Sequence, residues 1–482
     1  MADASSIQAA QEAIVPLRLL ADQAFSRAAG APLIPGNDVR LLRNAAENYP
    51  AWIDAIRSAR KTIHFETYIL HADKIGYEFA ELLETKAREG VTVRLIYDWF
   101  GARGAASFLF WRKLRKAGVE VRCFNPPRLD DPIDFLRRDH RKTIAVDARI
   151  GFVSGLCVGQ SWVGDPARGI APWRDTGVRI EGPAVLDLDR AFVRMWNSLA
   201  ASNLTQAEVS GDAVAPPSGD VALRIVASEP SMADLYRLDM LIAALARKSI
   251  WLTDAYYLGA PSYVQSLRAA AFDGVDVRLL VPRTSDIPMV RALSRVGYRT
   301  LLQSGVRVFE WNGAMLHAKT AVADGRWSRV GSTNLNLASW MTNYELDVVV
   351  EDEAFAHAMK EMYLDDLEGS TEIVLSEGTK VRPREPRRRR DRPRGSARGS
   401  AGRAATGLLA FGSTLGAAIA SPRLLGPTEA PILVAMALVL LCIVGLAILL
   451  PHSVSIFVAV CCGWASVTLL IKAVRLRFSR KK

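Results

Sequence analysis

HRKTIAVD at residues 140–147 and HAKTAVAD at residues 317–324 are two stretches of this 482-residue chain that follow one pattern. In each, a lysine stands two residues after a histidine, and an aspartate follows five residues later. The β-branched and apolar residues between lysine and aspartate predict a buried β-strand. Because side chains alternate between the two faces of a strand, each histidine and its lysine should project from the same side. The pattern makes six residues candidate catalytic residues: His140, Lys142, Asp147, His317, Lys319 and Asp324.

The sequence around these stretches is repeated as well. ARK occurs at 59–61 and again at 246–248, each time before a strand-like run, and GVTVRL at 90–95 matches GVDVRL at 274–279. These pairs are offset by 187 and 184 residues, close to the 177 residues that separate the two histidines. Strand-like runs alternate with helical patterns in both copies, which predicts a duplicated α/β unit.

The chain is expected to divide into six segments. The stretch before the first repeat has helical spacing, and it either packs on the body or lies on a membrane surface. The stretch between the repeats is rich in Ser, Gly, Pro and Ala, as linkers are. The expected boundaries are an N-terminal helical segment at 1–36, a first half at 37–202, a linker at 203–220, a second half at 221–368, a basic disordered linker at 369–403, and a C-terminal membrane region at 404–482.

The net charge of +11 is unevenly placed. Residues 380–403 carry +9 and residues 472–482 carry +6, so the rest of the chain carries about −4. The basic segments flank apolar sequence, which favours an anionic membrane surface as partner and gives no reason to expect nucleic acid. The five cysteines show neither zinc-like nor disulfide-framework spacing, and a reduced compartment is the simplest interpretation.

The C-terminal region contains two long uncharged runs. Residues 431–450 and 454–471 are each long enough to span a bilayer. The shorter run at 407–420 is interpreted as re-entrant or interfacial, or else as a third span. Two spans place both basic flanks on one side, as the positive-inside tendency requires. We therefore expect the cytoplasmic (inner) membrane, with the catalytic body on the cytoplasmic side; a buried pair of soluble helices is the alternative.

Paired histidines and lysines suit transfer at a phosphodiester. One imidazole can attack phosphorus while the other protonates the leaving oxygen and then activates the incoming hydroxyl. Lysine ammonium groups can balance the phosphate charge, so no metal or other cofactor is required.

Small polar residues follow each motif at equal spacing. Ser154 stands seven residues after Asp147, and Gly331 stands seven after Asp324, followed by Ser332 and Asn334. Glycine lets the backbone approach a phosphate closely, and hydroxyl and amide groups can bind its oxygens. The candidate substrate-binding residues are therefore Ser154, Gly331, Ser332 and Asn334.

An acidic residue follows in each half. Asp175 lies 35 residues after His140, and Glu345 lies 28 residues after His317. Each could accept a hydrogen bond from an imidazole and fix its tautomer, as acids do in other histidine-based sites. Asp175 and Glu345 are the candidate histidine-orienting residues.

These residues resemble the phospholipase D superfamily, and more narrowly its bacterial cardiolipin synthase branch. The resemblance covers about residues 37–365. It is carried by IHFETY at 63–68, FNP at 124–126, DHRK at 139–142, WRDT at 173–176, GPAV at 182–185, NLN at 334–336 and NYEL at 343–346.

The resemblance implies two α/β/α sandwich halves about a pseudo-twofold axis, with both motifs at one cleft. The uncharged runs add a C-terminal transmembrane helical region to this fold. It implies a phosphohistidine intermediate, with the two histidines as nucleophile and acid/base, and with Asp147 and Asp324 mainly structural. The implied activity is phosphatidyl transfer between phospholipids, with phosphatidylglycerol as substrate.

Two features depart from that branch. Cys157 stands where the branch usually has asparagine, and the apolar segments are C-terminal rather than N-terminal. Three other functions remain open at this point: a phospholipase D that releases phosphatidic acid, a nuclease of the same superfamily, and a non-enzymatic membrane scaffold.

Overall fold

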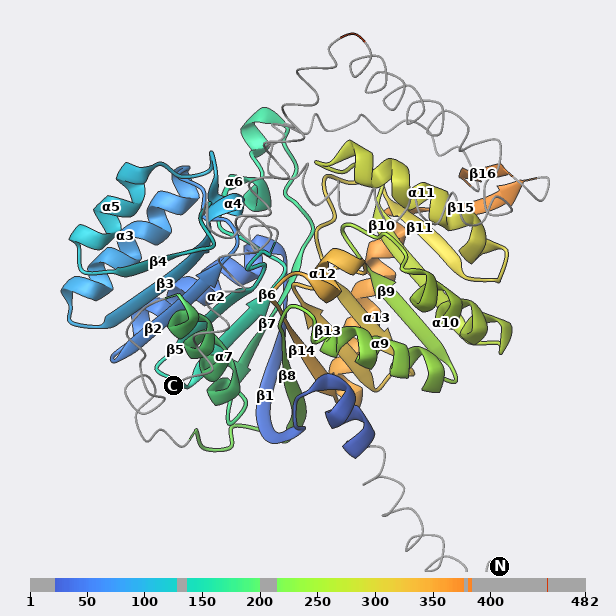
Figure 1. Ribbon diagram of the computed structural model, residues 1–482, viewed down its shortest axis with the longest axis horizontal. Coiled ribbons are helices and arrows are strands. Elements are labelled where there is room, and N and C mark those ends of the chain that lie inside the picture. The colour runs from blue at the N-terminus through green and yellow to red at the C-terminus, as the bar shows by residue number, and fades with distance from the viewer. Residues whose placement is uncertain (1–21, 128–136, 200–214, 377–379, 384–448, 450–482) are drawn as a thin grey trace, which may run out of the picture.

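The chain forms two α/β halves that meet along a central seam (Figure 1). The computed structural model describes residues 22–127, 137–199, 215–376 and 380–383, and Leu449. The halves are joined where strand β1 (Ile34–Arg43) pairs with strand β8 (Val221–Ser228). Through this pairing the strands of both halves form one continuous hydrogen-bonded order.

The first half alternates strands and helices before it turns antiparallel. Its elements after β1 are α2 (Asn44–Ser58), β2 (Thr62–Thr67), α3 (Lys74–Arg88), β3 (Thr92–Asp98), α4 (Trp99–Ala102), α5 (Phe108–Lys116), β4 (Glu120–Phe124), β5 (Lys142–Val146), β6 (Ile150–Ser154), α6 (Gln160–Val163), a 3-10 turn (Pro166–Arg168), β7 (Thr176–Glu181) and α7 (Val185–Ser198).

The second half follows the same plan and adds two strands. Its elements after β8 are α9 (Asp234–Leu245), β9 (Ser249–Thr253), α10 (Pro261–Phe272), β10 (Asp276–Pro282), α11 (Pro288–Leu302), β11 (Arg307–Trp311), β12 (Thr320–Ala323), β13 (Trp327–Gly331), α12 (Leu337–Met341), β14 (Glu345–Glu351), α13 (Glu353–Glu368), β15 (Ser370–Ser376) and β16 (Lys380–Pro383).

The strand order shows the duplication directly. Outward from the junction, the first half runs β1-β7-β6-β5-β2-β3-β4, and the second runs β8-β14-β13-β12-β9-β10-β11 before β15 and β16. Strands β2, β3 and β4 of the first half, and β9, β10 and β11 of the second, are parallel and connected through helices. The motif strands β5 and β12 instead pair antiparallel with their neighbours. The duplicated α/β unit expected from the sequence repeat is therefore present.

The motif strands β5 and β12 are buried along their whole length. Ile144 and Val146 of β5 pack in a core with Trp52 of α2, while Ala145 on the other face packs in a core with Leu188 of α7. That second core also contains Leu346, Val348 and other second-half residues, so it joins the two halves. Burial on both faces explains why the strand sequences lack the alternation of a half-exposed strand.

The expected boundary of the basic linker at residue 369 is wrong. Residues 370–376 form β15, which pairs with β11, and Lys380–Pro383 forms β16 on the edge of β15. Ile373 is buried in the second-half core, which anchors the added strand despite the basic sequence that follows it. A strand at a sheet edge is held by main-chain bonds, which side-chain charge does not prevent.

The C-terminal membrane region and most of the basic linker lie outside the described residues. Within the part that is described, no helix is long and apolar enough to cross a membrane. At the other end, residues 22–29 are helical, and Phe25 and Ala28 pack against the core of the second half. This packing agrees with the first of the two interpretations of the N-terminal segment.

Asp147 and Asp324 end the motif strands in a shared geometry. Both have a φ of 52°, in the left-handed region that aspartate tolerates better than most residues. The Asp147 carboxylate accepts backbone N–H bonds of 2.7–2.8 Å from Arg60, Lys61 and Thr62, at the start of β2. Asp324 accepts the equivalent three bonds from residues 247–249. These aspartates bind strand starts at the end of the motif strand remote from the histidine, a structural role.

Replacing Asp324 by asparagine should destabilise the second half. The change keeps the side-chain shape and its tolerance of positive φ, but removes the charge that three N–H groups share. Partial burial opposes ionisation, yet those donors hold the pKa of Asp324 below its usual value. We expect a loss of about 2 kcal/mol in the free energy of unfolding, measured by denaturant titration of the detergent-solubilised chain at pH 7.

The matched control is Asp54→Asn, because the side chain of Asp54 is 77% exposed and has only a 3.8 Å contact with Arg57. The control should stay within about 0.5 kcal/mol of the parent. Equal losses in the two variants would contradict the structural role of Asp324.

Candidate active site

The segment that carries the first histidine is bonded to the second half. The His140 backbone N–H donates to the carbonyl of Tyr344 at 2.9 Å, and the Tyr344 N–H donates to Arg138 at 2.8 Å. The second motif repeats the arrangement: the His317 N–H donates to Arg174 at 2.7 Å, and the Arg174 N–H donates to Met315 at 2.8 Å. Each histidine therefore lies beside the residue that precedes the other half's candidate acid.

Because of this backbone pairing, the acid of each half lies next to the histidine of the other half. The Nδ1 atom of His140 lies 2.9 Å from the Glu345 carboxylate, and the Nδ1 atom of His317 lies 2.8 Å from that of Asp175. Both carboxylates are fully buried, so an N–H donor facing them is strongly favoured. With Nδ1 protonated, Nε2 carries the lone pair of each neutral ring. The structure thus places both candidate orienting acids on histidines, each on the one from the opposite half.

The buried setting keeps both imidazoles neutral. His140 is 8% exposed and His317 is 5% exposed. Burial lowers the pKa of His140 to about 4 and that of His317 to about 3, and nearby lysines act in the same direction. Burial acts to raise the pKa of Asp175 and of Glu345, but the facing histidine and the lysines bring both below their usual values. The ground state is therefore a pair of neutral imidazoles against two carboxylates.

The two lysines complete the charge balance. The Lys319 ammonium lies 3.0 Å from the ring nitrogens of His317 and 2.5 Å from its carbonyl oxygen, and the Lys142 ammonium contacts the carbonyl of His140. Burial lowers the pKa of Lys142 and brings that of Lys319 to about 8. Two buried ammonium groups beside two imidazoles form a site suited to an anionic phosphodiester.

Among the residues that the structure describes, no group of three or more His, Cys, Asp and Glu side chains could hold a metal ion.

Comparison with known proteins identifies the family. The model of the cardiolipin synthase, PLD-like domain matches residues 52–196 and 241–366. Cardiolipin synthase A of Pseudomonas fluorescens (strain SBW25) is 34% identical over 356 residues, 73% of each chain. The cardiolipin synthase of Alkalihalophilus pseudofirmus is 31% identical over 350 residues, 72% of this chain and 69% of that protein. The chain belongs to this PLD-like cardiolipin synthase family.

Solved structures share the fold of this family member. The crystal structure of a phosphatidylserine synthase from Haemophilus influenzae Rd KW20 matches with a TM-score of 0.57 at 14% identity. The match covers 73% of this chain and 91% of that one. At this identity the likeness concerns the mixed α/β architecture.

The residues after the motifs have unequal surroundings in this family member. Ser332 donates its hydroxyl to Glu345 at 2.6 Å. Gly155 has the equivalent position in the first half, and a Cβ there would lie 2.1 Å from a carboxylate oxygen of Asp175. The indole N–H of Trp162 donates to Asp175 instead, at 3.0 Å. Ser332, predicted to bind substrate, thus holds the orienting acid, and Trp162 does the same in the other half.

The other three candidate substrate-binding residues differ in whether they have a side-chain group free to bind a ligand. The Ser154 hydroxyl accepts from the Leu156 N–H at 3.2 Å within a local turn, and Gly331 packs against Asp347, so the structure gives neither a free group for phosphate. Asn334 is 3% exposed, and its side-chain oxygen has no hydrogen-bond partner in the part of the chain that is described. That oxygen accepts hydrogen bonds and cannot bind a phosphate oxygen, so only the NH2 group of Asn334 could donate to one.

Cys157 has the position equivalent to Asn334 and lies near both lysines. It is 2% exposed, its carbonyl accepts from the Tyr49 hydroxyl at 2.6 Å, and burial raises the pKa of its thiol. A neutral thiol is a poor hydrogen-bond donor compared with an amide. The first half therefore offers a phosphate less than the second at this position.

Sequence analysis gave no role to the aromatic residues around the imidazoles. The ring of Tyr68 lies 4.9 Å from that of His140, and the ring of Tyr256 lies 5.7 Å from that of His317. Tyr68 is the first residue after β2 and Tyr256 is the third after β9, so the repeat in the sequence does not align them. The rings of Trp162 and Trp173 each lie 5.8 Å from that of His317, and Trp173 is the first residue of the WRDT sequence that carries the family resemblance.

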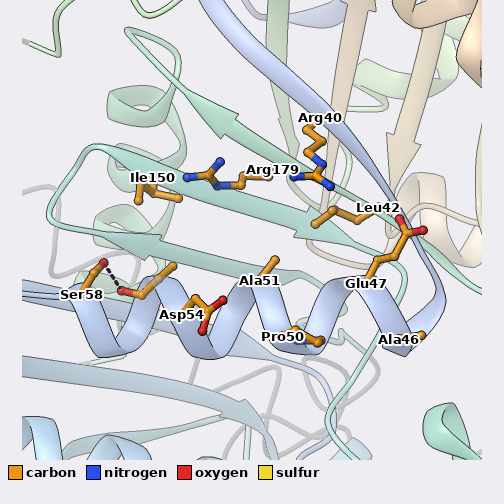
Figure 2. Close-up of a pocket in the computed structure, with 11 residues that line it drawn as sticks. Arg40, Leu42, Ala46, Glu47, Pro50, Ala51, Asp54, Ser58, Ile150 and Arg179 are labelled. Atoms are coloured by element: carbon orange, nitrogen blue, oxygen red, sulfur yellow. Dashed lines mark hydrogen bonds between the residues drawn. The ribbon is translucent and has the colours of Figure 1, made fainter.

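A separate hollow lies on the outer side of the first half, against α2, and contains none of the motif residues (Figure 2). It has a volume of about 520 Å³, and Arg40 and Arg179 line it. These arginines are directly opposite in the β1–β7 ladder, next to the opposed acids Asp38 and Glu181. Arg179 forms an ion pair at 2.6 Å with Glu181 of its own strand, which gives that arginine a structural partner.

The exchange of acids predicts which residues are energetically coupled. In a double-mutant cycle, His140→Ala and Glu345→Gln should show a coupling of about 1–2 kcal/mol in the free energy of unfolding, because each leaves the other unpaired in a buried site. His140→Ala with Asp175→Asn should be nearer to additive. The opposite ranking would contradict the cross-half pairing.

The depressed histidine pKa values predict acid sensitivity. Between pH 6.5 and about 4 the unfolded chain binds protons at His140 and His317 that the folded chain does not, so this stabilising contribution is present above pH 6.5 and is lost as pH falls. We expect the thermal midpoint to decrease over this window. The double variant His140→Gln/His317→Gln should show a shallower decrease, and an unchanged slope would refute the assignment.

Proposed function

We propose that this chain is a cardiolipin-synthase-type phosphatidyltransferase that works through a phosphohistidine intermediate. The observation that supports it most is the pair of buried imidazoles, each held at Nδ1 by a carboxylate of the opposite half. That arrangement turns the Nε2 atom of each ring away from its carboxylate; the Lys319 ammonium lies 3.0 Å from Nε2 of His317, and the Lys142 ammonium contacts the His140 carbonyl. Membership in the cardiolipin synthase family agrees with it.

In the first step, Nε2 of one histidine attacks the phosphorus of a phospholipid. A P–N bond forms, the P–O bond to the headgroup alcohol breaks, and the second imidazolium gives its proton to that alcohol oxygen. In the second step the now neutral imidazole takes a proton from the acceptor hydroxyl, whose oxygen attacks phosphorus and releases the first histidine. Lys142 and Lys319 balance the phosphate charge, and the NH2 group of Asn334 can donate a hydrogen bond to a phosphate oxygen.

The low pKa values suit the nucleophile, which must be neutral at physiological pH. The acid must carry a proton, and a bound phosphodiester supplies the negative charge that raises an imidazole pKa. One histidine is therefore neutral, as a nucleophile must be, before substrate binds, and the other takes up its proton when the phosphodiester binds.

Transfer is favoured over hydrolysis by the burial of the site. Both histidines and both lysines are at most 8% exposed, and aromatic rings flank each imidazole. Exclusion of water lets a lipid hydroxyl compete for the intermediate. We propose phosphatidylglycerol as donor and acceptor, with phosphatidic acid as the product that would reveal hydrolysis.

We also propose that the enzyme acts at the cytoplasmic membrane. The basic segments 380–403 and 472–482 and the apolar runs between them support this location through their composition.

The test is lipid transfer by the full chain in detergent with phosphatidylglycerol. His140→Ala and His317→Ala should each reduce cardiolipin formation by about a thousandfold, because each removes a reacting group. His357→Ala is the matched control, since it lies exposed on α13, and it should keep parent activity. Turnover stopped by detergent denaturation at mildly alkaline pH, where a P–N bond survives, followed by peptide mapping should place a phosphatidyl group on one of the two histidines.

Unchanged cardiolipin formation in both variants would refute the catalytic roles of the two histidines, and no cardiolipin formation by the parent would refute the transferase proposal. Phosphatidic acid as the dominant product would indicate a phospholipase D instead. Transfer without a trapped histidine adduct would refute the double-displacement mechanism alone.

A further inference from the structure

Large apolar side chains are exposed mainly at one end of the molecule. The described part of residues 22–376 has eleven exposed large apolar side chains, and eight of them lie in loops, short helices or first helical turns at the carboxyl ends of the parallel strands. This is the catalytic end, because Thr67 at the end of β2 pairs with Lys142, and Thr253 at the end of β9 pairs with Thr320. The other three are Leu245, Phe272 and Leu364.

In the first half, Phe108 and Leu109 begin α5 and are 70% and 63% exposed. The segment before them is fixed to the site: Asp98 caps α4 and accepts from the N–H of Asp139, beside His140. Gly101 of α4 is packed so closely on Tyr68 that a Cβ would lie 2.4 Å from the Tyr68 carbonyl oxygen. Tyr77 and Val163 are exposed at the same end.

In the second half, Leu337 and Met341 lie on α12, directly after the Ser332–Asn334 turn. Met232 is 56% exposed, and its neighbour Ser231 donates its N–H to the Met341 carbonyl. Met289 begins α11. The loop before it is bonded to the site, since the Tyr256 hydroxyl and Asp286 are 2.9 Å apart. Figure 1 shows α4, α6 and α12 close to the seam where the halves meet.

Among the described residues at this end, the exposed charged side chains are mostly basic. They are Lys74 and Glu78 at the start of α3 and four arginines in the loops, Arg103, Arg137, Arg168 and Arg283. The part of the Arg137 loop outside the described residues has Asp130, Asp131 and Asp134 in its sequence. This contrasts with the slight negative charge of the chain outside its two basic segments. Exposed apolar and basic side chains at the same end suit a bilayer surface with anionic headgroups. The apolar groups can enter the acyl boundary, and the cations can contact phosphates.

We propose that this end of the body, defined by the eight exposed apolar residues, docks directly on an anionic phospholipid bilayer and brings the histidine site to the lipid. The proposal rests on the proposed function for its substrate. It adds a contact surface on the folded halves to any attachment made by the C-terminal region. One of the short helices at this end is bonded to the site, because the indole of Trp162 on α6 donates to Asp175.

The test compares two paired variants of the full chain. Phe108→Ser/Leu109→Ser removes two apolar groups from the docking end, and Leu245→Ser/Phe272→Ser removes two, 52% and 69% exposed, from the opposite end. Each is assayed with phosphatidylglycerol vesicles and with short-chain phosphatidylglycerol dispersed as monomers. We expect the first variant to lose about tenfold on vesicles and less than about twofold on monomers. The second variant should match the parent on both.

A second measurement does not depend on turnover. Phe108→Trp and Phe272→Trp are compared for quenching by brominated phospholipids in phosphatidylglycerol vesicles. Greater quenching at position 108 is expected. Equal quenching, or an equal vesicle loss in both serine variants, would overturn the docking surface. Absence of transfer to either substrate by the parent, with quenching confined to position 108, would overturn the proposed function and leave the docking surface supported.

Discussion

The site depends on a carboxylate that each half supplies to the other half's histidine. Glu345 holds His140 and Asp175 holds His317, in both cases through Nδ1 at less than 3 Å. A buried carboxylate without such a donor would be costly, and a buried imidazole without an acceptor would lose its tautomer. Neither half can therefore form a complete site alone. The shared core and the bidentate pair of Arg174 with Asp366 keep the halves in the register that this exchange requires.

Much of this could be predicted from the sequence because the repeat is strong. The duplicated strand order, the two motifs and the two acids all follow from matching positions in the halves. The direction of the acid pairing could not be predicted, because it depends on two isolated bridges, Asp139 with Tyr344 and Arg174 with Leu316, between segments far apart in the chain. Spacing along the chain carries no information on such contacts.

The substrate-binding residues show a second limit of sequence reasoning. Ser154 and Ser332 were assigned by composition and equal spacing, yet their hydroxyls bond to a turn and to an acid. A hydroxyl next to a buried carboxylate is satisfied by it before any ligand arrives. The strand β15 was missed for a related reason: charge in residues 380–403 dominated the composition, while Ile373 and the main-chain pairing with β11 decided the structure.

The two halves differ beneath the motifs as well. In the second half, buried Arg329 lies between Asp239 and Asp347, at 3.5 and 3.9 Å. The equivalent ladder positions of the first half hold Phe152 and Gly177.

Asp347 also accepts the hydroxyl of Thr333, which lies between Ser332 and Asn334. Buried ion pairs contribute little net stability, but they penalise any arrangement that separates them. The cluster therefore fixes the turn that presents Asn334. The first half supports its equivalent turn, which ends at Cys157, by apolar packing. The difference between the halves is therefore not limited to Cys157 in place of an asparagine, because it extends to the buried residues beneath the two turns.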